Sequence, residues 1–259
     1  MTIKHTTPAE TGAGLLDDVR DTVARWARLD QDDAGAVALW VAATHAPECW
    51  AHAPRLLVNA ERGGWRSKLM GALAGLVHKP MTTATAAPLA VLRAVDARGG
   101  LDDPPTLLVH DWPPQWRRME LWALLGGGFH REAHTLTYDA AEGTVRRLSN
   151  YAMAAIFGPV PDYVTDQGVT VTLRATAPAG YRPRNRPGWH VLTDLHHRLN
   201  AWTDDQHLRL MTAIPVSPVT DRDADVWAPL LTVADTAGGH WPTTARALAT
   251  AHAAKEDRR

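Results

Sequence analysis

Short apolar runs alternate with helical stretches through the middle of the chain. The runs Arg55–Asn59 and Thr106–Val109 each follow a proline and have the length of a buried strand. Helical stretches are predicted at Arg66–Val77, Pro88–Val95 and Gln115–Leu125. Strands buried on both faces read as continuous apolar runs, and parallel strands need a long crossover between them. The alternation therefore predicts an α/β fold with a mainly parallel sheet and helices on both of its faces.

The pattern changes after the glycine run at residues 126–128. Residues 135–138 and 144–148 alternate in polarity on either side of a turn that contains glycine, which predicts a β-hairpin. The apolar runs at residues 151–157 and 169–175 predict two further strands, joined by a short helix or a loop.

Helical sequence lies on either side of this region. Apolar residues at helical spacing predict two helices before it and three after it, at residues 15–29, 33–45, 191–202, 224–237 and 242–251. Residues 1–13 are polar and contain Thr, Pro and Gly, so we expect a flexible N-terminus there.

Composition limits the classes of function. The formal net charge is −1, so binding to nucleic acid would need a local basic patch. The single cysteine, Cys49, cannot form an internal disulfide, and we interpret it as a buried bystander in a reducing compartment. The first residues lack the apolar stretch of a signal peptide, and the longest apolar run, residues 34–43, is too short to span a bilayer. We expect a cytoplasmic protein with no membrane contact.

A glycine loop between the first strand and its helix is similar to an altered phosphate-binding loop. In the pattern G-x-x-x-x-G-K-[ST], backbone amides wrap the phosphates, the lysine neutralises them and the hydroxyl holds magnesium. With Ser67 as the hydroxyl, Arg66 takes the lysine position and Trp65 takes the position of the second glycine. An indole there would fill the space of a phosphate. In the neighbouring frame, where Lys68 is the lysine, Leu69 replaces the hydroxyl.

The strand that should supply a magnesium ligand is altered as well. It normally ends in an aspartate, but here Thr106–Val109 is followed by His110 and Asp111. Magnesium prefers oxygen ligands, and Asp111 would point to the opposite face from His110. The residues alone leave open that both matches are accidental. We interpret these residues as a degenerate nucleotide site, and we expect neither a metal nor a cofactor in it. The candidate site comprises Gly63, Gly64, Trp65, Arg66, Ser67, His110 and Asp111.

Five segments carry a resemblance to a known family. They read "DDVRDTVARWARL", "AVALWVAATHAPECWAHAPRLLVNAE", "PTLLVHDW", "YAMAAIFGPVPDYVTDQGVTVTLRATAPAG" and "DRDADVWAPLLTVADTAGGHWPTTAR". Together, from about Leu16 to Arg246, they resemble the family called domain of unknown function 3631, found in actinobacteria, their plasmids and their phages. Its members look like P-loop ATPases related to replicative or helicase-type enzymes, often attached to primase-polymerase modules.

The resemblance implies a P-loop NTPase-like core with N-terminal helices and a C-terminal helical subdomain. The implied parts are a flexible N-terminus at 1–13, a degenerate P-loop-like α/β core with a helical lead-in at 14–180, and a linker with the helical subdomain at 181–259. The family typically reads C-G-K-[ST] at Gly64–Ser67 and D-E at His110 and Asp111, and it has a finger-like arginine at the position of Gln167. All three features depart here, so the resemblance implies the fold without ATP hydrolysis.

The resemblance also implies a setting. Short relatives without a primase portion occur among actinophage early proteins, and the large recombination directionality factors of phages with serine integrases look similar in size and setting. We therefore expect a non-catalytic accessory protein that binds a DNA-processing protein, such as a serine integrase or a replication protein, with a recombination directionality factor as its specific form. The alternative is an ATPase of DNA replication with divergent motifs, which would bind ATP and magnesium through Arg66, Ser67 and Asp111.

Three further groups of residues are candidates for binding. The basic loop with Arg182, Arg184 and Arg186 is typical of a solvated linker, and contacts with the phosphates of a nucleic acid are the alternative interpretation. Among the tryptophans, most of which fit a core, Trp112 and Trp116 are the candidates for a partner interface. His130 and His134 have the spacing of helical metal ligands, but their segment leads into a predicted strand, so we expect no metal there.

Overall fold

The computed structural model describes residues 11–60, 65–83, 87–97, 100–110, 115–173 and 188–256. The helices are α1 (Gly12–Ala27), α2 (Gln31–Ala43), η1 (Pro47–Cys49, a 3-10 helix), α3 (Trp65–Leu76), α4 (Pro88–Ala97), α5 (Gln115–Gly127), α6 (Asp162–Thr165), α7 (Trp189–Thr212), α8 (Asp221–Ala237) and α9 (Trp241–Glu256). The strands are β1 (Arg55–Ala60), β2 (Pro80–Thr83), β3 (Thr106–Val109), β4 (His134–Asp139), β5 (Thr144–Ser149), β6 (Ala154–Phe157) and β7 (Gly168–Leu173).

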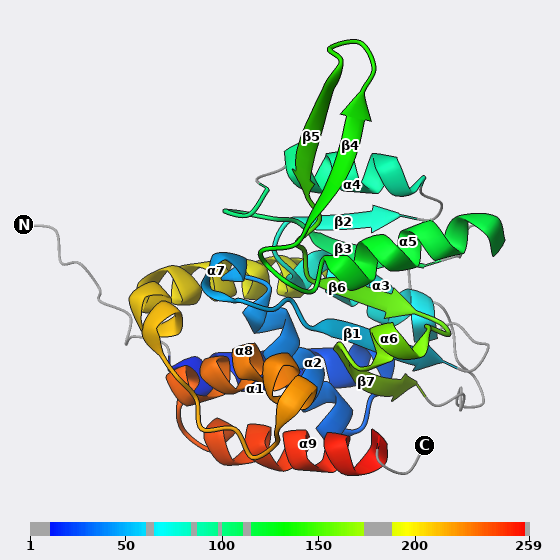
Figure 1. Ribbon diagram of the computed structural model, residues 1–259. Coiled ribbons are helices and arrows are strands. Elements are labelled where there is room, and N and C mark those ends of the chain that lie inside the picture. Colours follow the sequence, from blue (N-terminus) through cyan, green and yellow to red (C-terminus); the bar gives the residue numbers. More distant parts are fainter. Residues whose placement is uncertain are drawn as a thin grey trace, which may run out of the picture.

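A five-stranded parallel sheet forms the centre of the structure, in the order β2-β3-β6-β1-β7 (Figure 1). β1 lies between β6 and β7, with Val58 opposite both Phe157 and Val171. Because the strands are parallel, the residues after β1, β3 and β6 all meet at one edge of the sheet. The end of β1 and His110 therefore lie at the same edge.

Both faces of the sheet are buried under helices. Leu56 and Val58 point into a large cluster formed with α1, α2, α3, α7, α8 and α9, while Leu57 points into a second cluster formed with α4, α5 and α6. This alternation explains why the strands read as continuous apolar runs. The expected α/β fold class is confirmed, with a mainly parallel sheet and helices at both ends of the chain. In the sequence, β1 and α3 stand on either side of the glycine loop, as expected for a P-loop-like core.

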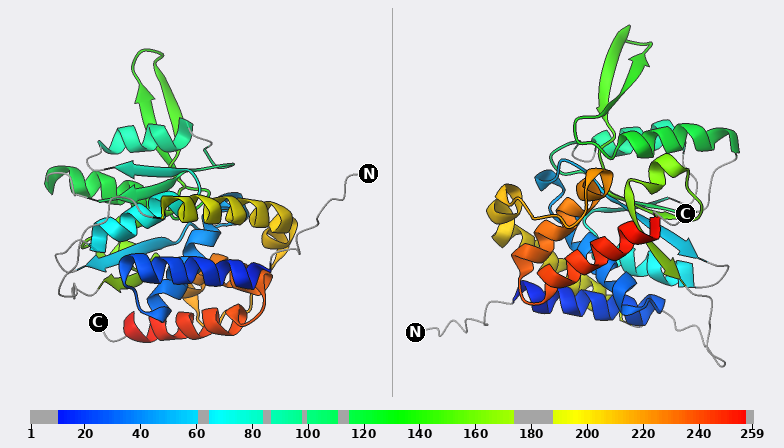
Figure 2. Two further views of the ribbon diagram at one scale, coloured as in Figure 1. Left: turned by 180° about the vertical axis from the view of Figure 1, so that it is seen from behind. Right: turned by 60° about the horizontal axis from the view of Figure 1, so that its bottom comes forward.

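The C-terminal helices pack against the N-terminal ones. Figure 2 shows α7, α8 and α9 beside α1, and the larger apolar cluster contains residues from all of these helices. Helices α3 and α7 approach closely at Gly75, where an added Cβ would lie 2.9 Å from Cβ of Leu192. The division of the chain at residue 180 stays a prediction, and the expected flexible segment 1–13 lies mostly outside the described residues. Within the described ranges, no helix combines the length and the apolarity that crossing a bilayer requires.

One helix is longer than its sequence pattern predicts. The expected helix at residues 191–202 extends to Thr212 as part of α7. Asp204 and Asp205 interrupt the apolar spacing, but the buried side continues through Thr203 and Leu210. Packing against the rest of the protein thus outweighs the local pattern.

The hairpin β4–β5 projects from the sheet (Figure 1). Its register places Tyr138 opposite Val145 and Leu136 opposite Arg147. The base of the hairpin is fixed where the backbone N–H of Ser149 donates to Oδ1 of Asp96 at 2.9 Å. The remaining residues of the two strands extend away from the sheet.

Candidate functional site

The first turn of α3 places the residue in the lysine position against the sheet. Arg66 donates a hydrogen bond from Nη2 to the carbonyl oxygen of Phe157 at 2.9 Å. Phe157 is the last residue of β6, the strand beside β1. The guanidinium group that would meet a terminal phosphate is thereby joined to the backbone at the end of the sheet.

Trp65 is also engaged by the protein. Its ring is partly buried against the large apolar cluster, and Cζ of Arg28 lies 5.3 Å from the ring centroid. Arg28 ends α1 in the left-handed conformation, with φ of 55°. A cation over an indole contributes about 0.5–1 kcal/mol at a partly exposed position. The indole is therefore held between the core and a cation at the place of the second glycine.

The other residues of the candidate site are only partly placed. Ser67 is exposed on α3, and His110 is half-buried after β3, where its backbone N–H donates to the carbonyl of Thr83 at 3.4 Å. Gly63, Gly64 and Asp111 lie outside the described residues. The structure thus brings Trp65 and Arg66 together with the end of β6 and places His110 at the same edge.

A cleft on the opposite face of β1 has the wrong charge for a nucleotide. It has a volume of about 400 Å³ and is lined by Leu57, Asn59 and the carboxylates of Asp162 and Asp166, among others. The two carboxylates would repel a triphosphate that entered this cleft. The cleft therefore gives no support to nucleotide binding beside the loop.

Gln167 is buried, at 8% exposure. Its carbonyl accepts a hydrogen bond from the backbone N–H of Arg55 at 2.9 Å. A finger that acts on a neighbouring subunit must reach out from the surface. This position therefore does not serve as a finger in the observed conformation.

The basic and aromatic candidates fall largely outside the described residues. Arg182, Arg184, Arg186 and Trp112 all lie there, and Trp116 belongs to α5 but its side chain is not described. The described tryptophans that are almost fully buried, Trp40, Trp227 and Trp241, agree with the prediction of a core role.

An exposed apolar face on the hairpin was not identified from the sequence. Leu136, Tyr138 and Val145 are 66%, 69% and 65% exposed, and the cross-strand register places them on the same face as Arg147. The alternation of residues predicts the strands, but it does not show that this face stays exposed among the described residues. Aromatic and arginine side chains beside aliphatic ones are typical of the centres of protein interfaces.

Cys49, His130 and His134 are not arranged as a catalytic group. Burial, with a smaller effect of the Glu48 carboxylate, raises the pKa of the Cys49 thiol to about 12, so the thiol is a poor nucleophile. His130 forms an isolated β-bridge with His52, with ring centroids 5.0 Å apart, and His134 begins β4. The segment between these two histidines is not helical, as expected.

Comparisons with known proteins address the resemblance. Residues 177–259 match the sequence model of the family described as "Protein of unknown function (DUF3631)". The "Uncharacterized 28.9 kDa protein in xis 5'region" of Saccharopolyspora erythraea is 49% identical over 63 residues, which is 24% of this chain and 24% of that relative. A full-length MCM homologue from Methanopyrus kandleri aligns over 96% of this chain and 62% of its own, with 12% identity and a TM-score of 0.43.

The matched region thus spans about a quarter of the curated relative and under two thirds of the solved structure. The resemblance of the segments before residue 177 stays a prediction. The match to the DUF3631 family model covers the C-terminal residues 177–259 and leaves the larger part of the chain outside it.

Proposed function

We propose that this protein is a non-catalytic accessory factor of an actinobacterial phage or mobile element that binds a DNA-processing protein. The specific role in this proposal is that of a recombination directionality factor for a serine integrase. The observation that carries the proposal is the hydrogen bond from Arg66 to the Phe157 carbonyl. Through this bond, the residue in the lysine position of the loop binds the protein's own backbone in place of a phosphate.

Nucleotide binding would have to undo existing contacts. A triphosphate in the loop would compete with the carbonyl of Phe157 for the guanidinium group, and hydrogen bonds of charged groups contribute about 1.5–3 kcal/mol. Trp65 would have to leave both the core and Arg28. His110 offers imidazole where magnesium requires oxygen. These costs favour a structural role for Trp65 and Arg66, which connect α3 to α1 and β6.

The projecting hairpin is the surface that we assign to the partner. It presents Leu136, Tyr138, Val145 and Arg147 on one exposed face. Aromatic and aliphatic side chains in this number bury enough apolar area on binding to anchor a protein contact. The name of the Saccharopolyspora relative places it 5' of xis, which is the setting expected for an accessory protein of excision.

The experiment is an excision assay with the serine integrase of the same element. Purified integrase is mixed with DNA that carries the attachment sites of the integrated element, with and without this protein. The proposal predicts excision only in the presence of the protein and co-elution of the two proteins on gel filtration. The double change Leu136→Ala with Tyr138→Ala should abolish both results.

Controls separate the partner surface from the loop and from the fold. Thr144→Ala, an exposed change on the other face of the hairpin, should leave excision and co-elution intact, as should Ser67→Ala. Excision unaffected by the double change would contradict the assigned surface. Magnesium-dependent ATP turnover that disappears in Ser67→Ala would support the ATPase alternative in place of the proposal.

A further inference from the structure

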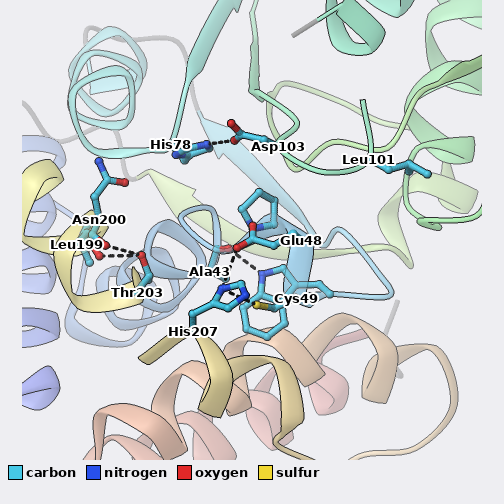
Figure 3. A network of polar contacts seen from close by, with 12 residues as sticks. Ala43, Glu48, Cys49, His78, Leu101, Asp103, Leu199, Asn200, Thr203 and His207 are labelled. Carbon is cyan, nitrogen blue, oxygen red and sulfur yellow. Dashed lines mark hydrogen bonds and ion pairs between the residues drawn. The ribbon is translucent and has the colours of Figure 1, made fainter. Parts of the chain in front are cut away.

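Three side chains that commonly ligate metals converge where η1 meets α7. Glu48 and Cys49 belong to η1, and His207 lies on α7 (Figure 3). Oε1 of Glu48 is 3.1 Å from Nδ1 of His207, and Sγ of Cys49 is 3.8 Å from the same nitrogen. The three ligand atoms all lie within 4.8 Å of one another, and each side chain is half-buried.

The arrangement differs from a catalytic triad. In a triad the histidine uses one ring nitrogen for the nucleophile and the other for the carboxylate. Here a single nitrogen, Nδ1 of His207, faces both the thiol and the carboxylate. That nitrogen carries a proton for Glu48 or a lone pair for Cys49, but not both at once. A cation between the three atoms would satisfy all of them together.

The distances agree with tetrahedral zinc coordination. With Zn–S near 2.3 Å and Zn–N or Zn–O near 2.0–2.1 Å, neighbouring ligand atoms lie about 3.4–3.6 Å apart. The observed 3.1 Å and 3.8 Å are within a few tenths of an ångström of these values. The third pair, Oε1 of Glu48 and Sγ of Cys49, lies within 4.8 Å, so rotation of these two side chains would bring all three atoms to one ion.

A cavity adjoins the cluster on the side of Cys49. This cavity has a volume of about 120 Å³ and is also lined by His52 and Asp225. This volume accommodates several water molecules, and the lining side chains offer them polar partners. Three protein ligands with one open position form a recognised class of zinc site.

We propose that Glu48, Cys49 and His207 bind one zinc ion, which links η1 to α7. A thiolate with an imidazole selects zinc over magnesium or calcium, and the bound ion deprotonates the thiol. The site joins the residues before β1 to the family-matched C-terminal region, because His207 lies within residues 177–259. This inference is independent of the proposed function, since it involves neither the glycine loop nor the hairpin.

The first test uses the reactivity of the only cysteine. Because the chain has one Cys, a coloured thiol reagent reports on Cys49 alone. The full chain without a histidine tag is stripped with a chelator and then given an equimolar amount of Zn²⁺. Zinc should slow the reaction of Cys49 at least tenfold, and removal of zinc by chelator should restore the rate.

Matched variants identify the other ligands. His207→Gln and Glu48→Gln should lose most of the zinc protection, while His197→Gln, an exposed histidine on the same helix, should keep it. Circular dichroism checks that each variant is folded. If His207→Gln fails to fold, Glu48→Gln gives the same comparison, because its side chain is only partly buried at the edge of the site.

A second test uses cobalt as a spectroscopic substitute. One equivalent of Co²⁺ should produce a thiolate charge-transfer band and the visible bands of tetrahedral cobalt, and both should be absent in Cys49→Ser. The proposal is overturned if excess Zn²⁺ leaves the reactivity of Cys49 unchanged, or if protection persists in His207→Gln. Cobalt spectra of an octahedral ion without a thiolate band would contradict it equally.

Discussion

Arg66 and Phe157 are 91 residues apart in the chain, and they are joined by one hydrogen bond of 2.9 Å across the edge of the sheet. The bond links the first turn of α3 to the end of β6. A residue in the position of a phosphate-binding lysine thus has a partner within the protein. Its contribution should be measurable as stability.

Arg66→Ala should destabilise the protein by about 1–3 kcal/mol, because it removes a charged donor from a partly buried carbonyl. A residue reserved for an absent phosphate would give a change near zero. Urea denaturation at constant pH measures the difference. Arg93→Ala, at an exposed position on α4, is the control and should stay within about 0.5 kcal/mol of the parent.

Two glycines of α3 provide a matched pair. Gly75→Ala would place its Cβ 2.9 Å from Cβ of Leu192, which should push α7 away and cost about 1–3 kcal/mol. Gly71→Ala meets nothing within 4 Å and should stabilise the helix by up to about 1 kcal/mol. Thermal denaturation of the two variants should therefore shift in opposite directions. Equal shifts would show that α7 does not approach α3 at Gly75.

Stability should fall as the pH decreases below 6.5. His45 is buried, with its ring nitrogens 2.7 Å from the Leu76 carbonyl and 2.6 Å from the Asn200 amide, and burial lowers its pKa to about 3. The folded state therefore stays neutral at His45 while the unfolded state takes up a proton, so stability present above pH 6.5 is lost as the pH falls toward 3. The expected slope from this residue is about 1.4 kcal/mol per pH unit.

Urea denaturation between pH 6.5 and pH 4.5 measures this slope. Burial also lowers the pKa of His52 and His196, so they add to it with the same sign. Partial burial raises the pKa of Asp103, but Lys79 and His78 outweigh this effect and hold it below its ordinary value. Asp103 therefore contributes to the pH dependence of stability only at lower pH. In His45→Asn, the change in unfolding free energy with pH should be smaller by about 1.4 kcal/mol per pH unit, because one proton fewer is taken up on unfolding. An unchanged slope would mean that His45 is protonated in the folded state.

Local patterns predicted most of the sheet. β3 has the predicted bounds, Thr106–Val109, because a proline precedes a short apolar run that is buried on both faces. Arg55, however, was predicted only as part of an apolar strand. In the structure it is almost fully buried and donates hydrogen bonds to the carbonyls of Ala152 and Leu125. A buried arginine is satisfied by distant carbonyls, and no local pattern encodes them.

The sequence predicted which residues form the candidate site, but it did not predict which residues they contact. The pattern identified Trp65 and Arg66 as replacements for glycine and lysine, but their partners Arg28 and Phe157 come from α1 and β6. The cluster around Cys49 shows the same limit. Its histidine is 158 residues away, on the part of α7 that extends beyond the predicted helix. Contacts between distant segments depend on how helices pack, and the spacing of residues within each helix does not specify them.

Calorimetric titration of MgATP into the tag-free protein measures whether the first turn of α3 still accepts a nucleotide. We expect no saturable binding up to a nucleotide concentration of about 1 mM, which corresponds to less than about 4 kcal/mol of binding free energy. To admit a triphosphate, Trp65 would have to leave the apolar cluster and Arg28, and Arg66 would have to leave the carbonyl of Phe157. A micromolar Kd that depends on magnesium and weakens in Ser67→Ala would show that the loop still binds nucleotide.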